Sequence, residues 1–146
     1  MNPYDLLREP FQSELDYFDK NRNVTGMAAE DNKIILNPYS SLNEQQKDSV
    51  IKNEATRILI RTGQVEKPSF DLTEEQNKYL DNSTYKNAGE DDRKATIAAR
   101  LFTGDTSGQN ATEDQMNYIS KLSDFFNKDN KWTLKIHAGM IITHGS

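Results

Sequence analysis

The stretch that decides the fold runs from Lys33 to Arg61 and reads KIILNPYSSLNEQQKDSVIKNEATRILIR. Its first four residues, Lys33–Leu36, form a short aliphatic run that predicts a strand. Asn37-Pro38 follows, and proline predicts the end of that strand because it has no backbone N–H to donate. A polar segment then leads into a long run with helical spacing. The stretch therefore predicts one strand followed closely by one long helix.

The long helix is expected to run from about Leu42 to Arg61. Ser41 and Glu44 have the spacing of a capping box, which opens a helix. At about 100° per residue, one side of the helix becomes a core-facing stripe. The residues of that stripe are Ile51, Ala55, Ile58, Leu59 and Thr62. Gly63 predicts the C-terminal stop, since glycine adopts the left-handed backbone conformation without strain.

Towards the N-terminus the sequence predicts a short helix that a proline interrupts. Asn2 can cap this helix and Pro3 can occupy its first position. Pro10 lies inside the helical pattern and is expected to kink or divide it. The polar residues 19–32, which include Gly26, predict a loop. The positions that follow helical spacing are Tyr4, Leu7, Phe11, Leu15 and Phe18.

The capping-box signature recurs twice after the long helix. Thr73 with Gln76 predicts a short helix, and Thr112 with Gln115 predicts a longer one. The longer helix carries an apolar stripe with a further phenylalanine beside it. These residues are Met116, Ile119, Leu122 and Phe126, with Phe125 alongside.

A further helix is expected between those two, running through Phe102. The acidic triplet Glu90-Asp91-Asp92 lies at its start, where the helix dipole favours negative charge. Gly104 is expected to end it. A cation site at the triplet is a weaker interpretation, because the alternating spacing of an EF-hand loop is absent.

The C-terminal segment changes from helical to alternating spacing. Trp132, Leu134 and Ile136 alternate with polar residues, and Ala138-Gly139 then predicts a turn into a second strand. We therefore expect a hairpin over 131–144 that could join Lys33–Leu36 in a small antiparallel sheet. The predicted fold class is α+β, mostly helical with about five helices. It is expected to be a single domain over 1–146, with an N-terminal helical segment (1–25), a helical core (33–127) and the hairpin.

The composition excludes several classes of site and partner. The chain has 146 residues, no cysteine and a net charge of −5, so disulfides and cysteine metal sites are excluded. The net negative charge argues against nucleic acid as the main partner. The mean hydropathy is −0.88, and no apolar run is long enough for a membrane span. The N-terminus has no basic start leading into an apolar run, so a signal peptide is not expected.

Asn53-Glu54-x-x-Arg57, within the long helix, has a faint likeness to the zincin helix. In zincins two histidines at i and i+4 bind zinc and the glutamate acts as general base. Arginine offers only donors and asparagine is not a usual zinc ligand, so this version cannot hold the metal. The favoured interpretation is structural, with Glu54 paired to Arg57 beside the apolar stripe.

Two other patterns are weaker still. His137 and His144 would lie on one face of the hairpin about 13 Å apart, too far for one ion. The glycine-rich segment Gly104–Gly108 follows a helix, whereas a phosphate-binding loop precedes one and carries a lysine. We therefore expect no catalytic, cofactor-binding or metal-binding residues, no cofactor, and no enzymatic activity.

Three segments carry a resemblance to a known group of proteins. They are Ile34–Ser40, Asn53-Glu54-x-x-Arg57, and Thr96–Leu101 with Gly104-Asp105-x-Ser107. Together they resemble small uncharacterised proteins of tailed bacteriophages and prophages, over roughly Gly26 to Gln115. The resemblance implies no particular activity.

Three functions remain open from the sequence. The first is a structural or virion-associated accessory protein that acts through contacts with other phage proteins. The second is a small acidic protein that binds and inhibits a host protein, because 23 acidic residues against 18 basic ones favour a basic target. The third is a degenerate metallopeptidase-like protein without zinc ligands. The expected location is the virion or the host cytoplasm.

Overall fold

The computed structural model describes residues 1–104 and 110–137, with side chains as far as residue 128. These residues contain five α-helices, one 3-10 helix and a two-stranded antiparallel sheet, which confirms the mostly helical α+β class. The elements are η1 (Pro3–Leu6), α1 (Gln12–Lys20), β1 (Gly26–Ala28), β2 (Ile34–Leu36), α2 (Glu44–Arg61), α3 (Glu74–Asp81), α4 (Glu90–Phe102) and α5 (Glu113–His137).

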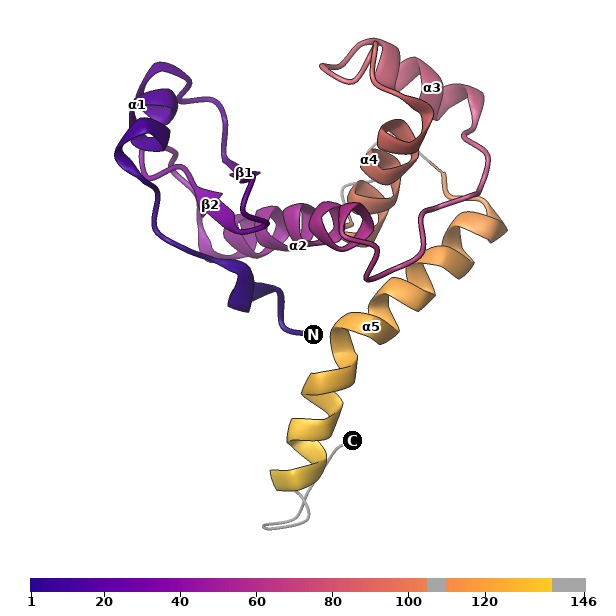
Figure 1. The fold of residues 1–146 in the computed structure, drawn as a ribbon. Helices are drawn as coiled ribbons and strands as arrows, with labels where there is room; N and C mark the ends of the chain where they lie inside the picture. Colours follow the sequence, from indigo (N-terminus) through magenta and orange to yellow (C-terminus); the bar gives the residue numbers. More distant parts are fainter. Residues whose placement is uncertain (105–109, 138–146) are drawn as a thin grey trace.

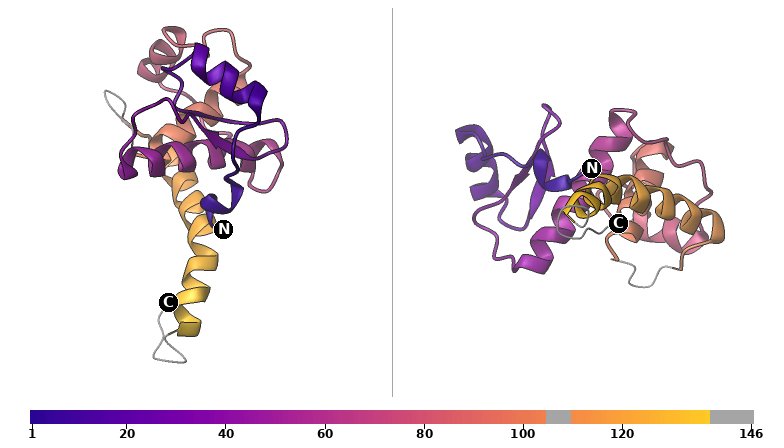
Figure 2. Two further views of the ribbon diagram at one scale, coloured as in Figure 1. Left: turned by 90° about the vertical axis from the view of Figure 1, so that its left-hand side faces the viewer. Right: turned by 90° about the horizontal axis from the view of Figure 1, so that it is seen from below.

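Helix α2 lies across the middle of the molecule. Figure 1 shows α1 and the small sheet at one end of α2, and α3 and α4 at the other. Helix α5 passes beside α4, and its C-terminal half projects away from the other elements (Figure 2). No helix within residues 1–104 and 110–137 is long and apolar enough to cross a membrane.

Proline divides the N-terminal segment as expected. Asn2 caps η1 through its side chain, which accepts a hydrogen bond from the Tyr4 backbone N–H at 3.0 Å. Pro10 lies between η1 and α1, so the two helical segments are separate. Arg8 then joins the start of α1 to the loop after β1, with 2.8 Å bonds to Glu14 and to Asp31.

The expectation of a loop throughout residues 19–32 is wrong for Gly26–Ala28, which form β1. Three residues are too few to show an alternating pattern, and β1 is a strand because it pairs with β2. The register places Gly26 opposite Leu36 and Ala28 opposite Ile34. Gly26 is needed for a close approach, since a Cβ there would lie 2.9 Å from Val50 Cγ1 and 3.0 Å from the Ile35 carbonyl oxygen.

The strand Lys33–Leu36 is confirmed as β2, but the helix after it begins two residues later than predicted. Its capping box is Asn43 with Gln46, whose reciprocal bonds measure 2.9 and 2.8 Å. Ser41 and Glu44 have the same spacing. Because asparagine and serine are about equally favoured as N-cap residues, the sequence alone does not decide between the two capping boxes. Gly63 ends the helix with a φ of +76°.

The predicted core stripe of α2 is confirmed except at its last position. Thr62 is exposed, and its hydroxyl bonds back to the Ile58 carbonyl at 2.8 Å. The four apolar residues of the stripe pack with residues of β2 and α5 in one cluster, the first hydrophobic cluster. The buried residues of that cluster are Ile34, Ile51, Ala55, Ile58, Leu59 and Phe126.

A second hydrophobic cluster lies between α3, α4 and α5. Its buried residues are Phe70, Leu80, Ile97, Ala98 and Leu101. In the predicted α5 stripe, Leu122 and Phe126 are buried and Ile119 is half-buried, whereas Met116 is 53% exposed and lies outside the core. Gln115 is fully buried in its place. The stripe therefore begins one turn later than predicted.

The predicted C-terminal hairpin is not confirmed. Helix α5 continues to His137, so Trp132, Leu134 and Ile136 lie on a helix instead of a strand. Adding residues to an established helix avoids the free-energy cost of nucleation. That advantage outweighs the strand preference indicated by a short alternating pattern. Ala138–Ser146, which include the predicted turn, the second strand and His144, lie outside the described residues. The chain segment that joins the sheet is instead Leu7, through a parallel bridge to Ile34.

Candidate functional site

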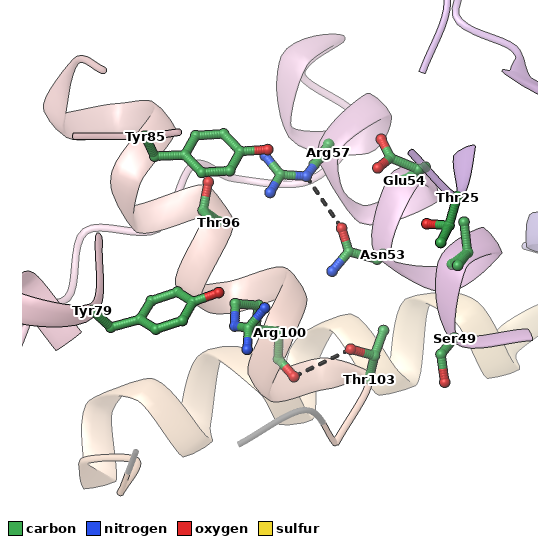
Figure 3. Close-up of a pocket in the computed structure, with 11 residues that line it drawn as sticks. Thr25, Ser49, Asn53, Glu54, Arg57, Tyr79, Tyr85, Thr96, Arg100 and Thr103 are labelled. Atoms are coloured by element: carbon green, nitrogen blue, oxygen red, sulfur yellow. Dashed lines mark hydrogen bonds between the residues drawn. The ribbon is translucent and has the colours of Figure 1, made fainter. Parts of the chain in front are cut away.

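A pocket of about 300 Å³ opens between α2 and α4. It brings together two segments that the sequence singled out separately. Asn53, Glu54 and Arg57 come from α2, and Thr96 and Arg100 come from α4 (Figure 3). Positions 53 and 57, and positions 96 and 100, are each one helical turn apart, so each pair shares one face of its helix.

Arg57 is held from two sides. Its guanidinium lies over the Tyr85 ring, 4.8 Å from the ring centroid. Its Nε donates to Asn53 Oδ1 at 3.2 Å, drawn as a dashed line in Figure 3. That bond uses one of the five N–H donors of an arginine. The stacking and the bond together restrict the rotamers of Arg57.

Arg100 is placed in the same manner on the facing helix. Its guanidinium lies over the Tyr79 ring at 4.3 Å from the centroid. Figure 3 shows each arginine beside its own tyrosine, and Asn53 hydrogen-bonded to Arg57. Cation–π stacking orients a guanidinium plane while keeping its charge. The pocket therefore presents two oriented cations.

The two tyrosines are fixed by contacts outside the pocket. Tyr85 lies in the turn after α3, and the guanidinium of the buried Arg93 donates to the Tyr85 carbonyl at 3.3 Å. Arg93 also donates to Asp81 at 3.1 Å and so joins α4 to the end of α3. Tyr79 belongs to α3 and packs on the second hydrophobic cluster. The arginines thus stack on rings that the fold itself positions.

Glu54 is the acidic side chain of the pocket. Burial raises the pKa of Glu54, because a low-dielectric environment disfavours the charged carboxylate. The positive charges of Arg57 and Arg61 oppose that rise in pKa, as does a hydrogen bond from the Ala28 backbone. In Figure 3, Glu54 and Tyr85 lie on opposite sides of Arg57.

The structural interpretation of Asn53-Glu54-x-x-Arg57 did not include the hydrogen-bond partner of Arg57, which is Asn53. Arg57 hydrogen-bonds to Asn53, four residues earlier, and acts on Glu54 through its charge. The two positions that are histidines in a zincin therefore bond to each other. Among the described side chains there is no group of three or more His, Cys, Asp or Glu residues able to hold a metal ion.

The other sequence candidates lie away from this pocket. Glu90-Asp91-Asp92 forms the first turn of α4, as expected, and Asp91 pairs with Lys67 at 3.2 Å. Gly104 ends α4 with a φ of +81°. The remainder of the glycine-rich segment, 105–108, lies outside the described residues, as does the side chain of His137.

Sequence reasoning missed this pocket as a site. It did not single out Tyr79 or Tyr85, and it noted Arg100 only within the phage-like pattern. One signal was available in the sequence. An uncharged polar residue occurs one helical turn before an arginine twice, at Asn53/Arg57 and at Thr96/Arg100. Nothing in the sequence indicates that the two helices face each other.

Comparisons with protein-family models, with characterised proteins and with solved structures gave no significant match. The class of ligand that suits the pocket is therefore inferred from the residues that line it. Two oriented guanidiniums suit a carboxylate or a phosphate, whose oxygens accept pairs of parallel N–H bonds.

Proposed function

We propose that the chain is a non-catalytic binding protein of a tailed-bacteriophage particle, acting through protein–protein contacts. In this proposal the α2–α4 pocket receives an anionic group of a partner protein. The observation that carries the proposal is that Arg57 and Arg100, on facing helices, are each stacked on a tyrosine, at 4.8 and 4.3 Å.

Stacked arginines favour binding for an entropic reason. A free arginine side chain loses rotamer entropy when it binds, which costs about 0.5–1.5 kcal/mol for each immobilised side chain. Stacking on Tyr85 and Tyr79 removes part of that freedom before the ligand arrives. A preorganised pair of guanidiniums then gains more net free energy from an anion than two mobile surface arginines would.

The phage context rests on the sequence pattern and is tested separately from the pocket. Particles purified from cells that produce the phage encoding this chain should contain the protein in a fixed ratio to the major capsid protein. Quantitative mass spectrometry measures that ratio. Particles that lack the chain would overturn the virion part of the proposal.

The role of the pocket is tested by complementation. Arg57→Ala and Arg100→Ala chains, supplied in trans to a phage that lacks the gene, should be lost from particles by about tenfold or more, as expected for residues that dominate an interface. The matched control is Arg22→Ala. Arg22 also lies over a tyrosine, Tyr39, at 4.6 Å, but outside the pocket. Equal incorporation of all three variants would show that the pocket does not bind the particle.

A second candidate is a protein that binds a host target during infection. The observation that favours it is the excess of 23 acidic over 18 basic residues, which would steer the chain towards a basic surface. Affinity capture from infected cells separates the two candidates. A virion protein should recover phage components, whereas a host-directed protein should recover one host protein in a stoichiometric amount.

A further inference from the structure

A groove runs along one side of α5. Two adjoining hollows of about 370 and 210 Å³ lie between α5 and residues 64–70, and both are lined by Glu66 and Tyr118. Together they extend along the helix from Asp114 to Phe125, and we call them the α5 groove. Eleven residues of helix rise by about 17 Å, so the groove is long enough for about three turns of a second helix.

Tyr118 holds the two walls of the α5 groove together. Its hydroxyl donates to the Glu66 carbonyl at 2.6 Å, and its ring packs edge-on against Phe70 with the centroids 5.7 Å apart. Burial raises the pKa of Tyr118 to about 12, so the hydroxyl keeps its proton at neutral pH and remains a donor. The groove is therefore formed before any partner arrives.

The two hollows of the α5 groove differ in polarity. Val65, Leu122 and Phe125 make the smaller one apolar. Asp114 and Lys121 line the larger one. Neither of these two charged side chains has a hydrogen bond or ion pair among the side chains that the structure describes. The groove therefore suits an apolar helix face with charged residues along its flank.

The second half of α5 supplies such a face. After Phe126 the helix continues to His137 and projects away from the other elements (Figure 1 and Figure 2). Trp132 and Ile136 follow Phe125 by seven and eleven residues. Helix geometry places these two positions on the same face of α5 as Phe125. The projecting half therefore continues the face that lines the groove.

We propose that two copies of the chain pair antiparallel along α5, with the projecting half of each helix lying in the α5 groove of the other copy. The lengths match, since Phe125 to Ile136 is also eleven residues. The pairing is self-complementary about a two-fold axis close to Phe125, which is the usual symmetry of a homodimer. In this register Trp132 comes opposite Tyr118 of the second copy. The surface is separate from the α2–α4 pocket and from the function proposed for it.

Charge complementarity argues for the antiparallel direction. With Phe125 at the axis, Lys121 lies opposite Asp129 of the second copy. Asp114 likewise lies beside Lys135 of the second copy. A parallel pair would instead place Lys121 against Lys121, and like charges repel. Asp129 also interrupts the apolar face of the projecting half, and one polar residue in such a seam fixes its register.

Sedimentation velocity on the full-length chain tests the pairing. We expect a dimer of twice the chain mass of 16.7 kDa that dissociates on dilution. Trp132 is the sole tryptophan, so its fluorescence gives a second readout. Its emission should shift to longer wavelength as the dimer dissociates, with the same midpoint as the mass. A single-chain mass at every concentration would overturn the proposal.

Charge reversal tests the register. Lys121→Glu and Asp129→Lys should each raise the dissociation constant of the dimer by about tenfold or more, because each places two like-charged contacts in the symmetric pair. An equimolar mixture of the two variants should form a heterodimer, since both contacts then join opposite charges. Unchanged dissociation constants in the single variants, or a mixture that stays monomeric, would overturn the antiparallel register.

The matched control is Lys86→Glu. Lys86 is exposed in the turn between α3 and α4, so the same change of charge there should leave the dissociation constant unchanged. A control that weakens the dimer as much as Lys121→Glu would overturn the specific contact. Lys121 is also exposed, so its variant should fold, and circular dichroism with the melting temperature checks this.

Spin labels give a distance that needs no charge-reversal variant. The chain has no cysteine, so a single labelling site can be introduced by Glu113→Cys or by Asn127→Cys, both at exposed positions. Antiparallel pairing about Phe125 separates the two labels along the helix axis by about 36 Å for position 113 and by about 6 Å for position 127. Equal distances at the two positions would show a parallel pair and overturn the proposal.

Discussion

Asn37 ties the end of β2 to the segment before β1. Its side chain is 3% exposed. Its Nδ2 donates to the Val24 carbonyl at 2.6 Å and to the Asn21 carbonyl at 3.4 Å, and its Oδ1 accepts from the Tyr39 backbone N–H at 2.8 Å. Both ends of one amide are therefore used, as a buried polar side chain requires. Asn37 fixes the loop that carries Thr25 to the edge of the pocket.

Asn37→Asp is expected to destabilise the protein by about 1–3 kcal/mol. The shape is kept, but the donor to the Val24 carbonyl is lost and an oxygen faces an oxygen. Urea unfolding at neutral pH measures the change in the free energy of unfolding. Asn23→Asp, at an exposed position of the same loop, serves as control. Equal stability of the two variants would show that the Asn37 amide does not hold the loop.

Helix α2 carries the core and the pocket on neighbouring faces. Ile51, Ala55 and Ile58 are buried in the first hydrophobic cluster, while Asn53 and Arg57 line the pocket. One rigid helix therefore couples the packing of the core to the position of an arginine. Its capping box and its glycine stop satisfy the backbone groups at its two ends.

Ile58→Ala should lower the free energy of unfolding by about 2–5 kcal/mol, through lost burial and the cavity left behind. Ile58 is 1% exposed. Gln45→Ala, at an exposed position of the same helix, should change stability by less than about 0.5 kcal/mol. Thermal unfolding followed by circular dichroism measures both. An unchanged melting temperature for Ile58→Ala would mean that this face of α2 is not in the core.

At the scale of the whole molecule, the glutamine side chains of two capping boxes hydrogen-bond to each other. Gln76 caps α3 with Thr73, and Gln115 caps α5 with Thr112. Both glutamines are fully buried, and each donates its Nε2 to the other's Oε1 at 2.8 Å. The pair joins the start of α3 to the start of α5. It also helps to hold α3, and therefore Tyr79, against the rest of the fold.

Gln76→Glu tests this link selectively. A glutamate keeps the side-chain oxygen that completes the capping box, but it replaces the Nε2 amide donor to Gln115 with a second oxygen. We expect a loss of about 1–3 kcal/mol in the free energy of unfolding, measured in urea. The converse change at an exposed neighbour, Glu75→Gln, should have little effect. If Gln76→Glu is as stable as the wild type, the inter-helix pair contributes nothing.

A second long-range link joins the N-terminus to α5. The Met1 ammonium donates to the Phe125 and Phe126 carbonyls at 2.9 and 3.2 Å. These carbonyls lie next to the stacked rings of Phe102 and Phe126, which are 4.9 Å apart. The link therefore fixes η1 beside the first hydrophobic cluster.

The sequence by itself determined the local structure wherever the deciding interactions are local. Asn2, Pro10, Gly63, Gly104 and the two Thr-x-x-Gln signatures act on backbone groups within a turn of themselves, so their effects could be predicted. The stripe of α2 followed from helical periodicity alone. The frame of its capping box was missed because Ser41/Glu44 and Asn43/Gln46 are equally good local patterns.

Tertiary structure decided what depends on contacts distant in sequence. Gly26–Ala28 became a strand only because β2 lies beside it, and Trp132–Ile136 continue a helix that began far upstream. The Gln76–Gln115 pair and the α2–α4 pocket arise where separate helices meet. Arg57 and Arg100 line one pocket only because α2 packs against α4, with Phe102 of α4 against the first hydrophobic cluster. No periodicity within either helix encodes that packing.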